Sequence, residues 1–208
     1  MTNTTARNVI FDFGGVLLRW NPEEIINGFY PDPRRREHLR QLVFQHPDWI
    51  DLDAGRLAED DAIQRFAARL GRPPNEMAAL LQHVKESLTP IEDSIALLHA
   101  LAKRNIPLYG LSNMPASTFA HLRRRYSHWD LFRGIVISGE VKLVKPERAI
   151  FDHIAHRYGL DPSQTVFIDD HRPNIEAASQ LGFRVILFRN PHQCASDLDG
   201  LLGNPSDV

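Results

Sequence analysis

The chain has 208 residues, of which 43% are hydrophobic and 24% are charged, as is typical of a globular protein with a packed core. Its 24 lysines and arginines against 26 aspartates and glutamates leave a net charge of −2, which argues against nucleic-acid binding through bulk charge. The single cysteine, Cys194, excludes an internal disulfide and a cysteine-based zinc site, and no run of 18 apolar residues offers a membrane span, so we expect a protein of the reducing cytoplasm.

The first element is expected in "NVIFDFGGVLLRW", residues 8–20. Val9 to Phe11 form a short apolar run, which predicts a strand buried on both faces. The run stops at Asp12, whose burial costs free energy unless a cation compensates it. Gly14 and Gly15 then allow a sharp turn or a close approach to a ligand. Taken alone, this stretch is as compatible with a purely structural role, a strand followed by a glycine turn with a capping aspartate, as with a functional site. The preceding "MTNTTARN" has no apolar stretch, so we expect no signal peptide.

Residues 20–90 have a different pattern. Segments such as "LAEDDAIQRFAARLG" show helical periodicity, and they are separated by the proline-rich breaks "YPDPRRR" and "GRPPNE". No strand is indicated there. We therefore predict a helical insertion over 19–90, placed within a core formed by 1–18 and 91–208.

After residue 90 the pattern alternates between helix and strand. "LTPIEDSIALLHALAKRN" predicts a helix, with Thr89, Pro90 and Glu92 at capping-box spacing. Further helices are predicted in "PASTFAHLRRRY", "KPERAIFDHIAHRYG" and "PNIEAASQLG", and strands in "IPLYGLSN", "GIVIS", "TVFIDD" and "FRVILF". This alternation predicts an α/β fold: a Rossmann-like parallel sheet in a three-layer core. The tail after Pro191 is weakly patterned, and we expect fraying from Gly203 to Val208.

Polar residues fall at the predicted carboxyl ends of these strands, where open parallel sheets bind ligands. They are Asp12, the pair Ser112 and Asn113, Lys145, and the pair Asp169 and Asp170. A Ser-Asn pair is more often a helix cap, and a Lys-Pro pair more often only begins a helix. Two adjacent carboxylates, however, repel each other unless a cation or proton lies between them. Three acids without cysteine or histidine favour a hard cation, Mg²⁺ before zinc.

Taken in order, four motifs resemble the haloacid dehalogenase-like (HAD) hydrolase superfamily: the strand ending in Asp12-Phe13-Gly14-Gly15-Val16, Leu111-Ser112-Asn113, Lys145-Pro146, and Asp169-Asp170 with Asn174. The resemblance covers nearly the whole chain, including a helical cap after the first motif. "FDFGGVL" and "SGEVKLVKPERAIF" are most similar to bacterial sugar-1-phosphate phosphatases and to the phosphatase half of mammalian soluble epoxide hydrolases.

The resemblance implies a role for each motif. Asp12 would be the nucleophile that attacks phosphorus and forms an aspartyl-phosphate. Mg²⁺ would be held by Asp12, the backbone carbonyl of Gly14 and Asp170, with Asp169 as a further ligand or as a residue behind the ligands. The Ser112 hydroxyl and the Asn113 N–H would bind phosphate oxygens, and Lys145 would place positive charge on the transferring group and on Asp12.

One position departs from many phosphatases of this family, which carry a second Asp two residues after the nucleophile as general acid and base. Gly14 stands there. Such assistance is worth about 10²–10⁴-fold in rate. We favour a substrate with a good leaving group, such as a sugar 1-phosphate. The proton could instead come from water or from the predicted cap, where the candidates are His46, Asp48, Asp51 and Asp53. A third explanation is a slow or non-phosphatase member.

Two alternatives to a phosphatase stay open. A 2-haloacid dehalogenase also lacks the second Asp, although its fourth motif typically lacks the paired acids. A catalytically silent binding module would keep the fold and lose the chemistry. The partner expected is a small phosphorylated metabolite, with no nucleic acid or membrane, and the chain is expected to be a monomer or homodimer.

Several smaller features have two interpretations each. Asn174 either holds the loop of the acidic motif or caps a helix, and Trp49 either shapes the substrate pocket or packs in the cap. Arg56 is either a pocket residue or part of a helix-linking turn, and His171 is either at the site mouth or simply exposed. The basic runs "DPRRREHLR" and "LRRRY" are interpreted as solvated helix faces.

Overall fold

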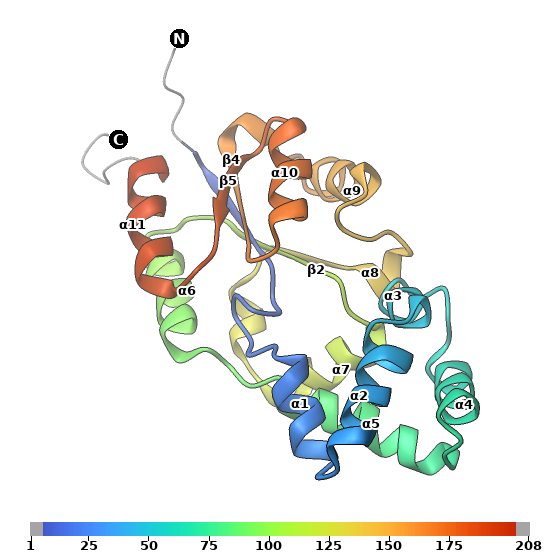
Figure 1. The fold of residues 1–208 in the computed structure, drawn as a ribbon. Helices are drawn as coiled ribbons and strands as arrows, with labels where there is room; N and C mark the ends of the chain where they lie inside the picture. The colour runs from blue at the N-terminus through green and yellow to red at the C-terminus, as the bar shows by residue number, and fades with distance from the viewer. Residues whose placement is uncertain (1–5, 203–208) are drawn as a thin grey trace.

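A parallel five-stranded sheet lies at the centre of the protein, and the computed structural model describes residues 6–202 (Figure 1). The strand order is β3-β2-β1-β4-β5, so the first strand is in the middle of the sheet. The strands are β1 (Asn8–Phe11), β2 (Leu108–Ser112), β3 (Gly134–Ile137), β4 (Thr165–Asp169) and β5 (Arg184–Leu187). All four strand pairs are parallel. The predicted Rossmann-like α/β fold is therefore confirmed.

Helices cover both faces of this sheet, because successive residues of a buried strand point to opposite sides. Val9 and Phe11 belong to a core shared with α6 (Glu92–Lys103), α7 (Ala116–Arg125) and α11 (Pro191–Leu202). Ile10 belongs to the opposite core, shared with α9 (Arg148–Tyr158) and α10 (Arg172–Gln180). Short elements complete this part of the chain: α8 (Ser138–Val141) and the 3₁₀ turns η2 (His128–Leu131) and η3 (Pro162–Gln164). The result is three layers.

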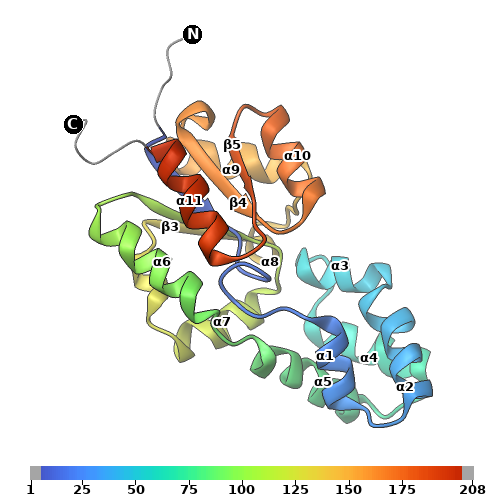
Figure 2. The same cartoon turned by 60° about the vertical axis from the view of Figure 1, so that its left-hand side comes forward.

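Between β1 and α6 the chain forms only helices, as the sequence predicted. These elements are α1 (Pro22–Phe29), α2 (Pro33–Leu39), a π-helix η1 (Arg40–Phe44), α3 (Pro47–Asp53), α4 (Glu59–Leu70) and α5 (Pro74–Ser87). They share a hydrophobic core of their own, built around Leu39, Phe66 and Leu80. Figure 2 shows this helical insertion, which we define as residues 19–90, at one end of the sheet.

One local prediction was wrong. The capping box at Thr89 does not form: α6 begins at Glu92 with Ile91 as N-cap, since Pro90 pairs with Leu18 and the Ile91 N–H donates to the Leu17 carbonyl. For the weakly patterned tail after Pro191 no element was predicted, and the structure has a helix there, α11, in which Cys194, Leu198 and Leu202 recur at four-residue spacing and are buried. The expected fraying of 203–208 lies outside the described residues.

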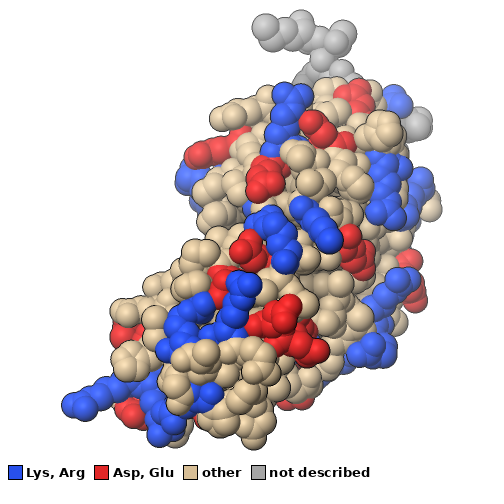
Figure 3. Space-filling model, turned by 90° about the vertical axis from the view of Figure 1, so that its right-hand side faces the viewer, with Lys and Arg blue, Asp and Glu red and all other residues tan. Residues whose placement is uncertain are grey.

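The surface of the described chain carries mixed charge. Figure 3 shows basic and acidic side chains interspersed on one face. In the run "DPRRREHLR", Arg40 pairs with Glu23 and Glu37, and most of its neighbours are exposed, as expected of a solvated helix face. Between residues 6 and 202, no helix is both long and apolar enough to cross a membrane.

Candidate active site

The sheet topology brings the four motifs together at one edge. Asp12 follows β1, Ser112 ends the neighbouring strand β2, and Asp169 ends β4 on the other side. Lys145 arrives on the loop between α8 and α9. Parallel strands end on the same edge of a sheet, and ligands bind in the crevice there. A cavity of about 530 Å³ opens at this edge, and its lining includes Asp12, Ser112 and Lys145.

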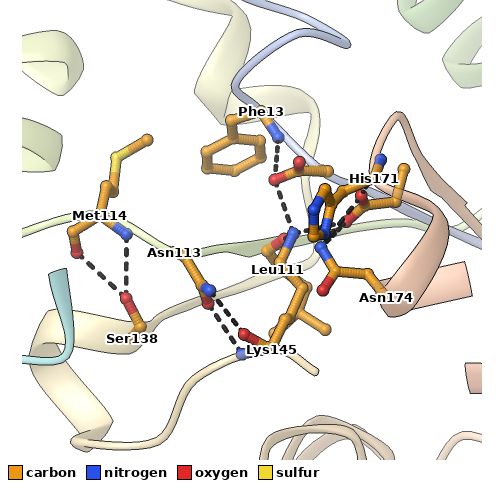
Figure 4. A network of polar contacts seen from close by, with 10 residues as sticks. Phe13, Leu111, Asn113, Met114, Ser138, Lys145, His171 and Asn174 are labelled. Carbon is orange, nitrogen blue, oxygen red and sulfur yellow. Dashed lines mark hydrogen bonds and ion pairs between the residues drawn. The ribbon is translucent and has the colours of Figure 1, made fainter. Parts of the chain in front are cut away.

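Lys145 is the electrostatic centre of this site. Its Nζ lies 2.8 Å from Asp12 Oδ1 and 2.7 Å from Asp169 Oδ2, and it donates to the Leu111 carbonyl at 3.0 Å (Figure 4). The side chain is almost fully buried. Burial alone lowers the pKa of Lys145, but the charges of Asp12 and Asp169 outweigh it and raise the pKa above its usual value. Lys145 is therefore a fixed cation between two carboxylates.

Asp12 is a buried carboxyl group whose negative charge is only partly compensated by Lys145. Burial raises its pKa from 3.8 to about 7; Lys145 opposes this rise and Asp169 adds to it. One of its oxygens also accepts from the Phe13 N–H at 2.6 Å. These contacts orient the carboxylate into the cavity. One lysine does not compensate all the negative charge collected here, so a further cation would be favourable.

The residues present fit a metal. Carboxylate oxygens of Asp12, Asp169 and Asp170 lie within 4.8 Å of one another, and an all-oxygen set suits Mg²⁺. Burial, followed by the charge of Asp169, raises the pKa of Asp170. Gly15 makes this approach possible: it has φ +76°, and a Cβ there would lie 2.1 Å from Asp170 Oδ2. Of the two roles expected of the glycine pair, the sharp turn is found at Gly15, whose φ is positive.

Asp169 is held from several sides. Besides Lys145, it accepts from the His171 N–H at 2.8 Å and from Asn174 Nδ2 at 3.0 and 3.1 Å. Asn174 thus takes the loop-holding alternative among its two interpretations. His171 is exposed, and it also lines the cavity, so each of its two interpretations describes part of its position.

Two contacts in the site had no recognisable sequence signal. The Asn113 side chain clamps the Lys145 backbone: its Nδ2 donates to the Lys145 carbonyl and its Oδ1 accepts from the Lys145 N–H, both at 2.9 Å. The Ser138 hydroxyl accepts from the Met114 N–H at 2.9 Å and donates to the Asp53 carbonyl at 2.5 Å. Each joins segments that are far apart in the sequence, so spacing alone gives no hint of either.

Gly14 has no side chain that could act as a general acid. A Cβ on Gly14 would point toward Trp20, with Cβ and Cγ of that residue at 3.5 and 3.6 Å. A side chain at position 14 would therefore make ordinary van der Waals contact with the tryptophan.

Three of the four proton-donor candidates in the insertion are engaged elsewhere. Asp48 is paired with Arg65 and Arg69, and although burial opposes them, these arginines keep its pKa below the usual value. His46 accepts from the Asp48 N–H at 3.1 Å as the cap of α3. Asp51 pairs with Arg56 at 2.8 Å, and neither lines the cavity. Asp53 does line it. Trp49 is both buried in the insertion core and part of the cavity wall.

Comparison with known proteins agrees with this geometry. The family model described as haloacid dehalogenase-like hydrolase matches residues 6–182. The chain is similar to a sesquiterpene phosphatase of Aspergillus oryzae, with 30% identity over 86% of this chain and 88% of the relative. It is also similar to a D-ribitol-5-phosphate phosphatase of Bacteroides thetaiotaomicron, with 22% identity over 95% and 99% of the two chains. A HAD family enzyme of the same bacterium, crystallised as a mutant with magnesium and inorganic phosphate, superimposes with a TM-score of 0.74 at 21% identity, covering 88% of this chain and 94% of that one; this likeness shows a shared fold.

Proposed function

Because the chain belongs to the haloacid dehalogenase-like hydrolases, we propose that it hydrolyses phosphate monoesters of small molecules, with Asp12 as the nucleophile. The observation that carries the proposal is the cluster of three carboxylates, two of them in contact with one buried lysine, at the sheet edge where the cavity lies. The relatives named as phosphatases support the same reaction class. Attack of Asp12 on phosphorus would release the alcohol and leave an aspartyl-phosphate, which water then hydrolyses.

The chain's own residues supply most of what this reaction needs. Lys145 would hold Asp12 in its charged form and stabilise the negative charge of the transferring group. The Ser112 hydroxyl and the Asn113 N–H would bind phosphate oxygens. Mg²⁺ would be held by Asp12, the Gly14 carbonyl and Asp170, where it would neutralise charge between nucleophile and phosphate. Asp169, whose oxygens accept hydrogen bonds from Lys145, His171 and Asn174, would orient Lys145 and the loop of the acidic motif.

The helical insertion, residues 19–90, would act as a cap over this site, since Trp20, Trp49 and Leu81 line the cavity from that side. The core of 1–18 and 91–208 would carry the chemistry. From Gly14 alone, the expected substrate is an ester with a good leaving group, such as a sugar 1-phosphate. The dehalogenase alternative is disfavoured because Asp170 joins the carboxylate cluster and a metal-free reaction has no use for it.

The proposal is tested by phosphate release from aryl, sugar-1-, sugar-6-, alkyl and nucleotide phosphates, each measured with Mg²⁺ and with chelator. We expect turnover that requires Mg²⁺ and is lost in Asp12→Asn, with a loss of at least about 10³-fold in kcat. Phosphate release that survives in Asp12→Asn would contradict the proposed nucleophile. No release from any substrate would favour a silent module, and chloride release from 2-haloacids would identify a dehalogenase.

A further inference from the structure

The part of the cavity formed by the helical insertion is apolar. Trp20, Phe44 and Trp49 form an aromatic cluster there, with ring centroids 4.5 to 6.4 Å apart. Leu52, Leu81 and Val84 line the same wall. The polar groups of the proposed chemistry are instead gathered at the sheet edge. The cavity therefore has a charged end and an apolar end.

Apart from Asp53, whose backbone is held by Ser138 at the sheet edge, the polar side chains that the insertion contributes to the cavity are occupied. Glu59 pairs with Lys85 at 2.6 Å and accepts a hydrogen bond from Ser117. A polyol bound here would have to compete with these contacts, because a buried hydroxyl without a partner is costly. The wall is thus poorly equipped to recognise the ring hydroxyls of a sugar.

Ile50 adds an independent observation. Within residues 6–202 it is the most exposed large apolar side chain, at 57%, and it lines the cavity. An apolar ligand that leaves the cavity past Ile50 would remove this surface from water, which is favourable. A volume of about 530 Å³ lies within the ordinary range for small-molecule sites.

We propose that the substrate is the phosphate monoester of an extended hydrocarbon alcohol, whose chain lies against the aromatic wall and Ile50. This inference rests on the proposed function for the phosphate end. It replaces the sugar 1-phosphate that Gly14 alone suggested. The residues of the cavity wall would contact the alcohol directly, whereas the general acid missing at position 14 bears only on how easily the alcohol leaves.

Binding of n-alkyl phosphonates of increasing length, measured by calorimetry with Mg²⁺, tests this without any need for turnover. We expect the dissociation constant to fall by up to about fourfold per added methylene until the cavity is filled. Ile50→Ser should flatten this dependence for the longest chains, whereas Ala78→Ser, on the exposed face of α5, should not. A dissociation constant independent of chain length would overturn the inference, even if phosphate release from other substrates upholds the proposed function. Chain-length dependence without phosphate release would uphold the ligand class and reject the reaction.

A second inference comes from a different observation, the free carboxyl group of Asp53. Unlike its acidic neighbours in the insertion, this half-buried side chain has no hydrogen bond or ion pair with the described residues. Its backbone is fixed at the sheet edge, since its carbonyl accepts from Ser138, which also binds the Met114 backbone next to Ser112 and Asn113. Burial raises the pKa of Asp53 well above the usual value.

We infer that Asp53 takes the place of the general acid and base missing at Gly14. As Asp12 forms its bond to phosphorus, the bond between phosphorus and the ester oxygen breaks, and the Asp53 carboxylic acid gives its proton to that oxygen, which leaves as the alcohol. In the second step the Asp53 carboxylate takes a proton from water. The resulting hydroxide bonds to phosphorus, the bond to Asp12 breaks, and phosphate leaves with both aspartates restored.

The leaving group decides this test. An alkoxide needs the proton and a nitrophenolate does not, so Asp53→Asn should lower kcat about 10²-fold or more for alkyl phosphates and far less for p-nitrophenyl phosphate. Asp51→Asn, which breaks only the exposed pair with Arg56, is the matched control. Equal losses on both substrates would indicate a structural role, and no loss on either would exclude Asp53 from proton transfer; both outcomes overturn the inference while wild-type turnover keeps the proposed function.

Discussion

Among single residues, the main feature of the site is a set of charged side chains that are buried away from water. Lys145 is fixed between Asp12 and Asp169, and the Asn113 amide fixes the Lys145 backbone. Removing one member of such a buried set leaves the other charges uncompensated, at a cost of several kcal/mol, about 3–5 for a broken buried pair. The lysine is therefore both part of the proposed chemistry and a condition for folding around three carboxylates.

Gly15 is expected to be irreplaceable for the metal site. Gly15→Ala would place a Cβ 2.1 Å from Asp170 Oδ2 at a backbone φ of +76°. We expect the backbone strain to lower the free energy of unfolding by about 1 kcal/mol. We also expect the Mg²⁺ concentration that gives half-maximal phosphate release to rise at least about tenfold. Gly159→Ala is the control, since its φ is +63° but a Cβ there would meet nothing within 4 Å in the described part of the chain. Equal Mg²⁺ dependence in the two variants would show that Asp170 does not need this approach.

His128 should make the protein less stable in acid. It is buried, its Nε2 has no hydrogen-bond partner among the described residues, and its pKa is lowered from 6.5 to about 4, first by burial and then by His99. Between those two pKa values the unfolded chain binds more protons than the folded one, so stability rises with pH and falls on acidification. The free energy of urea unfolding of His128→Phe, compared with that of the wild type, should therefore be about 1 kcal/mol higher at about pH 5 than at about pH 7.5. His38→Gln, an exposed histidine, is the control; the same pH slope in wild type and His128→Phe would contradict the prediction.

At the scale of elements, α11 shows how a buried stripe outweighs weak local patterning. Cys194, Leu198 and Leu202 pack into the core on the side of α6. Leu198→Ala should lower the free energy of unfolding by about 2–4 kcal/mol through the lost burial and the cavity. Gly200 lies inside the helix, and a Cβ added there would have no neighbour within 4 Å among residues 6–202, so Gly200→Ala should raise stability by about 0.5 kcal/mol. Unfolding in urea measures both; opposite signs are expected, and no effect from either would mean that this segment is not helical.

At the scale of the whole molecule, the insertion touches the core where α3 meets α8. Gly55 has φ +66°, and a Cβ there would lie 2.3 Å from the Gly139 carbonyl. Gly71 has φ +61° and open space around it. Both alanine variants should lose about 1 kcal/mol of stability. Only Gly55→Ala should also lower kcat/KM, because it displaces α3, which carries Asp53 and Trp49. Equal kcat/KM in the two variants would show that this contact does not position the cap.

Hydropathy and residue order alone predict the parallel α/β core, the helical character of 20–90 and the set of polar residues at the strand ends. Hydrophobic periodicity is a local property, and parallel strands must end on one edge. Asp12, Ser112, Asn113, Lys145, Asp169 and Asp170 could be selected on that basis.

How those residues meet depends on contacts between segments that are far apart in the sequence. The clamp between Asn113 and Lys145 spans 32 positions, and the bond between Asp53 and Ser138 spans 85. Contacts of this kind depend on the packing of whole elements against one another, and no spacing along the chain encodes them. For the same reason the sequence left four proton-donor candidates equivalent, whereas ion pairs and a backbone cap engage three of them and leave Asp53 facing the cavity.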